Sequence, residues 1–179
     1  MPTFDTGAQA APVVDITLAG LGLTGTATTF LDPHGVPSGG DWALQRTAAL
    51  WFQGTERLSV QDCVLQRLDG NALMLSGYNR HAAIVNNTFL STGASAIALW
   101  GSTSGTHPAQ PAGTGPDGTA GNFPRYTLVE GNFIRSLGVH EKQSSCLFQA
   151  KSAQSIVRRN LCFDIPRVRN HSISPSPRP

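Results

Sequence analysis

Three residues that can exchange or stabilise charge stand in consecutive positions in the stretch GVHEKQ: His140, Glu141 and Lys142. Such a set suits general acid–base catalysis, because one group can donate a proton while another accepts one. Arg80, in GYNR, can bind the carboxylate of a sugar acid through two parallel hydrogen bonds and stabilise the negative charge left after proton removal. In that scheme Lys142 or His140 is the group that abstracts the proton.

Asp69 and Glu141 offer a second kind of chemistry. Hydrolysis of a glycosidic bond uses two carboxyl groups about 5 to 9 Å apart. The two residues occupy equivalent turns of a sequence repeat, two units apart, and stacked units lie about 4.8 Å from each other. A charged turn can also simply be solvated, or Glu141 can be clamped by Lys142, Arg80 or Arg125, and the sequence leaves these interpretations open.

The elements that must position these groups come from an internal repeat. The stretches LSVQDCVLQRLDGNALMLSG (58–77) and AAIVNNTFLSTGASAIALWG (82–101) carry one apolar pattern, offset by 24 residues. Repeats of about 20 to 50 residues indicate stacked units that bury their apolar faces against each other. The apolar position of the first strand recurs at intervals of 24, 45 and 28 residues, with one earlier copy, at Leu18, Val60, Ile84, Val129 and Val157.

Asparagine recurs in the same register, three residues after the apolar position, at Asn87, Asn132 and Asn160, with Cys63 in the remaining copy. Asparagine tolerates the unusual dihedral angles of tight bends, and its amide can bond to the next layer, so we expect a stacked ladder. The second complete copy reads as three short strands, at roughly 82–85, 88–91 and 96–100. The pattern predicts an all-β, parallel β-helix of about four to five coils with three short strands per coil.

The repeat and its asparagine bends resemble the right-handed parallel β-helix of the pectin-lyase-like superfamily over residues 13–165. The stretches LDPHGVPSGGDWALQR, LSGYNRHA and EKQSS also resemble uncharacterised right-handed β-helix proteins. The resemblance implies a polysaccharide or oligosaccharide partner, held in a groove for lyase, glycoside hydrolase or epimerase-like chemistry, and an extracellular location. A non-catalytic module that binds glycan or protein, and a truncated inactive form, are the alternatives. No set of Ca²⁺ ligands matches position for position, so no cofactor is expected.

The third strand of each copy gives the predicted groove its floor. Alternation in ALWFQG (49–54), ALMLSG (72–77) and AIALWG (96–101) predicts that Leu50, Phe52, Leu73, Leu75, Ile97 and Leu99 point inward. In SCLFQA (145–150) we prefer the register that buries Cys146 and Phe148 and turns Leu147 outward. The candidate substrate-binding residues on and beside the outward face are Trp51, Gln53, Tyr78, Trp100 and Gln149. Alternatively, Trp51 and Trp100 form a satellite core beneath long loops.

Residues 1–12 read as an N-terminal extension and residues 166–179 as a disordered tail rich in proline and serine. Insertions near 24–48 and 102–125 flank the third strand and include His34 and His107, in stretches that read mainly as turns and a flap. The last coil before the tail lacks a cap, so self-association through it is a further expectation.

Composition excludes several classes of protein. With 13 Lys and Arg against 11 Asp and Glu, the net charge of +2 does not favour a nucleic-acid partner. No apolar run is long enough to span a membrane, and the first residues lack the pattern of a signal peptide. The three cysteines, Cys63, Cys146 and Cys162, read as small core residues, because an odd, scattered set fits neither a disulfide scaffold nor a zinc site.

Overall fold

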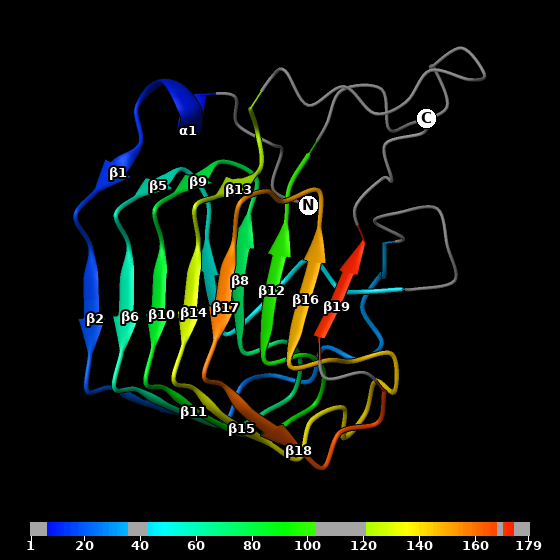
Figure 1. Ribbon diagram of the computed structural model, residues 1–179. Helices are drawn as coiled ribbons and strands as arrows, with labels where there is room; N and C mark the ends of the chain where they lie inside the picture. Colours follow the sequence, from blue (N-terminus) through cyan, green and yellow to red (C-terminus); the bar gives the residue numbers. More distant parts are fainter. Residues whose placement is uncertain (1–6, 36–42, 103–120, 168–169, 174–179) are drawn as a thin grey trace, which may run out of the picture.

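The computed structural model describes residues 7–35, 43–102, 121–167 and 170–173. Over these ranges the chain winds as a parallel β-helix (Figure 1), and every pair of neighbouring strands is parallel. A single turn of helix, α1 (Gly7–Ala10), lies in the predicted N-terminal extension. The predicted fold class is therefore confirmed.

Four sheets run along the β-helix, named here after the strands of one coil. The β6 sheet contains β2 (Thr17–Ala19), β6 (Ser59–Gln61), β10 (Ala83–Val85), β14 (Leu128–Glu130) and β17 (Ile156–Arg158). The β7 sheet contains β3 (Gly22–Thr24), β7 (Val64–Leu68), β11 (Thr88–Thr92), β15 (Phe133–Arg135) and β18 (Leu161–Phe163). The β8 sheet contains β4 (Leu50–Phe52), β8 (Leu73–Ser76), β12 (Ile97–Trp100), β16 (Leu147–Ala150) and β19 (Asn170–Ile173). The β9 sheet contains β1 (Val13–Val14), β5 (Thr55–Glu56), β9 (Asn79–Arg80) and β13 (Pro124–Arg125).

The β9 sheet is a difference from the prediction of three strands per coil. The three predicted strands of the second copy appear as β10, β11 and β12. The strands of the β9 sheet are only two residues long, which is too short for an alternating apolar pattern to show in the sequence.

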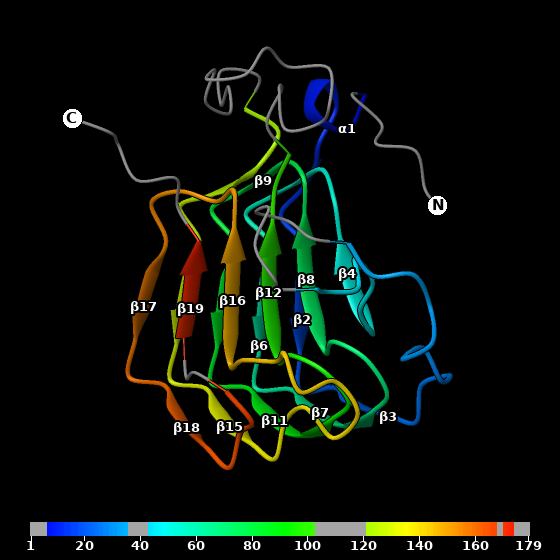
Figure 2. The same ribbon diagram turned by 90° about the vertical axis from the view of Figure 1, so that its right-hand side faces the viewer.

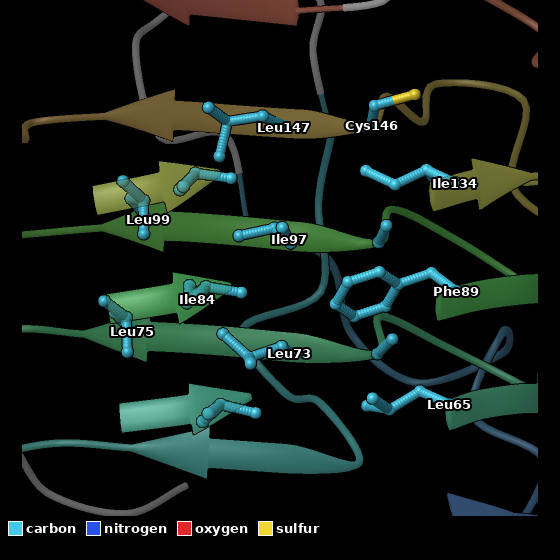
Figure 3. Packing of buried hydrophobic residues seen from close by; sticks show 14 of the residues in the cluster. Leu65, Leu73, Leu75, Ile84, Phe89, Ile97, Leu99, Ile134, Cys146 and Leu147 are labelled. Carbon is cyan, nitrogen blue, oxygen red and sulfur yellow. The ribbon is translucent and has the colours of Figure 1, made fainter. Parts of the chain in front are cut away.

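Like side chains stack in columns inside the β-helix, as the repeat predicts. Ile84 pairs with Val60 on one side and Val129 on the other, and the predicted column continues to Leu18 and Val157. Figure 3 shows parallel columns of this core, with Phe89 between Leu65 and Ile134. Buried apolar residues fill these columns, so their burial provides the main stabilisation of the fold.

The asparagine ladder is present at the bend between the β6 and β7 sheets. The Asn132 side chain accepts hydrogen bonds from the backbone N–H and the side-chain amide of Asn87, at 2.9 and 3.1 Å. Asn160 does the same for Asn132, at 3.0 and 2.9 Å, and the Asn87 oxygen accepts from the N–H of Cys63 at 3.0 Å. Because Asn87 and Asn132 are buried, these bonds satisfy polar groups that water does not reach.

The predicted register of the fourth copy is wrong by one residue. Leu147 pairs with Ile97 and packs in the core, whereas Phe148 pairs with Ala98 on the outward face. Cys146 is buried, as predicted, and Phe148 is buried too, in a second apolar cluster outside the β-helix. The same shift aligns Gln149 with Leu99, in the inward column. A one-residue slip exchanges the faces of a strand, and apolar residues in succession left both registers open.

The outward face of the β8 sheet is covered rather than open. Leu44 and Ala48, from the first insertion, pack on a cluster that includes Met74, Trp100 and Phe148. Gly35 pairs with Leu44, and the Trp100 ring lies so close to Gly35 that a Cβ there would come within 2.9 Å of it. Trp100 is 6% exposed, so of the two alternatives for this residue the satellite core beneath a loop is the one observed, and the described part of the first insertion covers this face at Trp100.

Two features at the C-terminal end depart from the sequence predictions. Residues 170–173, placed in the disordered tail, form β19 and pair with β16. Cys146 and Cys162, interpreted as separate core residues, are paired as a disulfide, while Cys63 is a buried free thiol. The strands β17, β18 and β19 are edge strands, and self-association there stays a prediction. The described residues contain no helix that is long and apolar enough to cross a membrane.

Candidate functional site

Three of the predicted catalytic residues, Asp69, His140 and Glu141, lie at the corner where the β7 sheet passes into the β8 sheet. Asp69 directly follows β7, and His140 and Glu141 lie in the connection from β15 to β16, which Figure 2 shows in yellow looping below the β8 sheet. The backbone N–H groups of His140 and Glu141 both donate to the carbonyl of Gly93, at 3.1 and 2.9 Å. Gly93 belongs to the coil between those of Asp69 and Glu141, so these two bonds hold the turn of His140 and Glu141 in register with the corner.

Gly93 allows the corner to close. A Cβ at this position would lie 1.4 Å from the Asp69 carbonyl oxygen and 3.0 Å from Cδ2 of His140. No side chain fits in that space, because the nearest obstacle is backbone and cannot rotate away. The glycine thus lets Asp69 and His140 approach from the coils on either side of it.

Two imidazole–carboxylate pairs form at this corner. His140 Nε2 lies 3.3 Å from Asp69 Oδ1, and His34 Nε2 lies 3.1 Å from Glu141 Oε2. The carboxylates are shielded, with side chains 12% and 11% exposed, whereas the imidazole of His140 is 42% exposed and that of His34 27%. The histidines therefore stand between the carboxylates and the solvent.

The environment of Glu141 favours its protonated form. Burial raises the pKa of the Glu141 carboxyl above its ordinary value, and the nearby charge of Asp69 raises it further, although the hydrogen bond to His34 acts in the opposite direction. One carboxylate oxygen, Oε1, is buried without a hydrogen-bond partner among the described residues. A carboxyl group in these surroundings is suited to donating a proton.

The first insertion contributes to the corner with residues that the sequence did not single out. The backbone N–H of Thr29 donates to Asp69 Oδ2 at 2.5 Å, and the ring of Phe30 lies 5.4 Å from that of His140. In the sequence, His34 stood out only as part of a turn-rich stretch. The signal that could have indicated a role is that it is a titratable residue in an insertion beside the third strand of the repeat. Gln45 donates to the Thr29 carbonyl within the insertion, and its own carbonyl accepts from the Asn71 side chain at 3.0 Å, which fixes this part of the insertion to the β-helix.

Lys142 does not join the two pairs. Its ammonium group donates to the carbonyls of Gly138 and Val139, at 2.7 and 3.1 Å, and so closes its own turn. The predicted clamp between Glu141 and Lys142, Arg80 or Arg125 is also wrong, since Glu141 pairs with His34.

Arg80 lies at the opposite end of the β8 sheet, in β9. Its guanidinium donates to the backbone carbonyls of Phe123 and Gly121, at 2.5 and 2.7 Å, and lies 4.2 Å from the ring centroid of Tyr78. Figure 1 places β9 at the top of the β-helix, whereas the strands of the β8 sheet start at the bottom. The structure thus places Arg80 and His140 at opposite ends of the β8 sheet, and the role of Arg80 in stabilising charge stays a prediction.

The five predicted substrate-binding residues do not share one open face. Trp100 is buried under the insertion, and Gln149 lies in the inward column, where it accepts from Ser152 at 3.2 Å. Tyr78 donates to Glu56 at 2.5 Å in the Arg80 corner. Trp51 is 37% exposed near the N-terminal coil, and Gln53 accepts from Ser76 at 3.5 Å. Their roles in substrate binding stay predictions.

Among the described ranges, no group of three or more His, Cys, Asp or Glu residues is arranged to hold a metal ion. The insertion near 102–125, with His107, falls mostly outside the residues that the structure describes. Comparison with known proteins gave no matching family model, no matching curated protein and no matching solved structure.

Proposed function

We propose that this chain is a carbohydrate-active β-helix domain that hydrolyses glycosidic bonds of a polysaccharide at the Asp69–Glu141 corner. The observation that carries the proposal is the pair of carboxyl groups in unlike surroundings. Burial raises the pKa of Glu141, while Asp69 accepts a backbone hydrogen bond from Thr29 and pairs with His140. Glycoside hydrolysis needs one carboxyl group that is protonated and one that is ionised.

Each residue of the corner has a role in this scheme. Glu141 donates its proton to the glycosidic oxygen as the bond to the leaving sugar breaks. Asp69 acts on the opposite side of the sugar ring, either by taking a proton from the attacking water or by bonding to the sugar itself. His34 and His140 hold the two carboxyl groups in place, at 3.1 and 3.3 Å. Phe30, 41% exposed beside His140, offers a ring face for stacking against a sugar.

Hydrolysis is supported better than lyase or epimerase chemistry. Both of those reactions remove a proton next to a carboxylate and need a cation close to the base to stabilise the resulting charge. Arg80 was the predicted cation, and it is bonded to the carbonyls of Gly121 and Phe123 at the other end of the sheet. The effect of the Asp69 charge on the Glu141 carboxyl supports the carboxylate pair that hydrolysis requires. The resemblance of the repeat to pectin-lyase-like β-helices supports the same class of substrate.

The test is an assay of neutral and acidic polysaccharides that records both new reducing ends and absorbance at 235 nm. The wild type should release reducing ends without the unsaturated product that absorbs at 235 nm. Glu141→Gln and Asp69→Asn should each lower turnover by about 100-fold or more, because each removes a proton-transfer or charge-stabilising group from the transition state.

Arg80→Ala is the matched control, since it changes a charged residue of the same β-helix outside the corner. It should keep turnover within about threefold of wild type. Full activity in both Glu141→Gln and Asp69→Asn, with circular dichroism spectra like that of the wild type, would remove the corner from the mechanism. A rise at 235 nm that depends on Arg80 would instead establish lyase chemistry.

A non-catalytic glycan-binding module is the second candidate. It is favoured by the low exposure of both carboxylates, which are already paired with imidazoles, one of which, His34, ties the first insertion to the turn. In that case oligosaccharide titration should show binding that Phe30→Ala weakens, with no product formed over long incubation. Product that depends on Glu141 would eliminate this candidate.

A further inference from the structure

The disulfide partners come from successive coils and both point into the β-helix. Cys162, in β18, pairs with Ile134 and lies in the core column of Phe89. Cys146 precedes β16 and aligns with Ala96. Their Cα atoms are 6.5 Å apart, within the range for a disulfide, and the two residues are 8% and 1% exposed.

Among the described residues, the coil that this bond anchors is paired with another coil on one side. The strands β17 and β18 are edge strands, and Ile156 and Leu161 on them are 57% and 56% exposed. In a stacked repeat, each unit is stabilised largely by its neighbours, so a coil paired on one side opens more readily than a coil paired on both. A covalent bond to the preceding coil adds to the strand pairing that holds it.

The interior beside the bond is incompletely filled. A cavity of about 200 Å³ is lined by both cysteines and by apolar residues of the last two coils, among them Val129, Leu147 and Val157. Leu161 and Arg159 also line it, and both are largely exposed, so the cavity lies next to the surface. The disulfide and the cavity therefore occupy the same place in the last described coil.

The geometry points to a redox clasp: the Cys146–Cys162 disulfide holds the terminal coil, residues 151–167, against the β-helix, and exchange with a thiol releases it. A thiolate attacks the sulfur of Cys162, the S–S bond breaks, and its electron pair leaves on the sulfur of Cys146, which takes up a proton. A second thiolate then attacks the mixed disulfide and frees Cys162. A small-molecule disulfide such as oxidised glutathione accepts the two electrons when the clasp reforms.

Counting thiols and melting the full chain tests this clasp, independently of the proposed hydrolysis. When the oxidised protein is denatured and treated with iodoacetamide, one of its three cysteines, Cys63, should be alkylated, and all three after dithiothreitol. Reduction should lower the melting temperature by roughly 6 to 12 °C, as expected for a cross-link closing a short loop in a chain of this size. Loss of amide protection should concentrate in residues 156–163.

Matched serine variants separate the clasp from general effects of cysteine loss. Cys146→Ser and Cys162→Ser should melt at the temperature of the reduced protein and no longer respond to dithiothreitol. Cys63→Ser should keep the full response. Three alkylated cysteines in protein purified without reductant and then treated with oxidised glutathione would overturn the proposal. So would a wild-type melting temperature that reduction leaves unchanged.

Discussion

The two ends of the β8 sheet hold charged side chains in different ways. At the end where the strands begin, Asp69 and Glu141 pair with imidazoles, one of which comes from the first insertion. At the end where they finish, Arg80 donates to the backbone carbonyls of Gly121 and Phe123, in the last part of the second insertion. Stacking of the coils places titratable residues at both ends of the β8 sheet. The two ends differ in what the insertions contribute, because the first insertion contributes an imidazole and the second contributes backbone carbonyls.

The end that holds Arg80 is saturated with fixed contacts. Tyr78 donates to Glu56, which raises the pKa of the Tyr78 hydroxyl and keeps it protonated. In register, Arg80 lies between Glu56 and Arg125, and Arg125 donates to Gln154. The side chains of Tyr78, Arg80 and Arg125 thus all donate hydrogen bonds to other parts of the chain. We therefore expect it to contribute stability, and the other end to contribute chemistry.

Gly93→Ala should have the largest effect, because it removes the close approach on which the acid–base end depends. Its Cβ would collide with the Asp69 backbone, and the destabilisation should be roughly 4 kcal/mol or more, measured by urea unfolding. Gly70→Ala is the control, since its Cβ would meet the Thr29 hydroxyl, which can rotate away. Equal stabilities of the two variants would show that the coils do not meet so closely at Gly93.

Arg80→Ala should cost about 2 kcal/mol of unfolding free energy, as expected for loss of hydrogen bonds from a charged donor to backbone carbonyls. Its turnover should stay near that of the wild type. Urea unfolding and the reducing-end assay on the same preparation give both quantities. Lost activity with unchanged stability would reverse the comparison between the two ends.

The pH dependence of stability should differ in sign between two glutamates. The folded pKa of Glu141 is raised, so its contribution is present below the ordinary value of 4.5 and lost as the pH rises through the folded pKa. The Arg158 hydrogen bond lowers the pKa of Glu130, so its contribution is present above 4.5 and lost as the pH falls through the lowered value.

As the pH rises, Glu141→Gln should therefore gain stability relative to the wild type, while Glu130→Gln should lose it. Urea unfolding of the three proteins from about pH 3 to pH 7 measures both slopes. Slopes of the same sign would contradict the assigned surroundings of Glu141. This is the smallest expected effect, because the His34 pair partly offsets the burial of Glu141.

The sequence predicted the scaffold because the scaffold is periodic. The columns of Val60, Phe89 and Asn132 each repeat in register, so one copy constrains the next. The fourth copy failed at Leu147 and Phe148, where two large apolar residues in succession remove the alternation that sets the faces. The cysteine pair was also missed, because its partners come from different strands of successive coils and no spacing rule links them.

Periodicity also explains why part of the candidate site could be predicted from the sequence. Asp69 and Glu141 occupy equivalent turns, so stacking alone places them at one corner. His34 and Thr29 lie in an insertion without periodicity, and nothing in the sequence shows where such a segment docks. Arg80 was predicted on the flank opposite His140, and β9, which contains it, lies at the other end of the β8 sheet.

Carbon-13 NMR titration of the Glu141 carboxyl group, in the wild type and in Asp69→Asn, tests the central claim most directly. The proximity of Asp69 contributes to the raised pKa of Glu141, so the substitution should lower that pKa towards its ordinary value. A wild-type Glu141 pKa at the ordinary value, unchanged in Asp69→Asn, would mean that the two carboxyl groups do not share a corner.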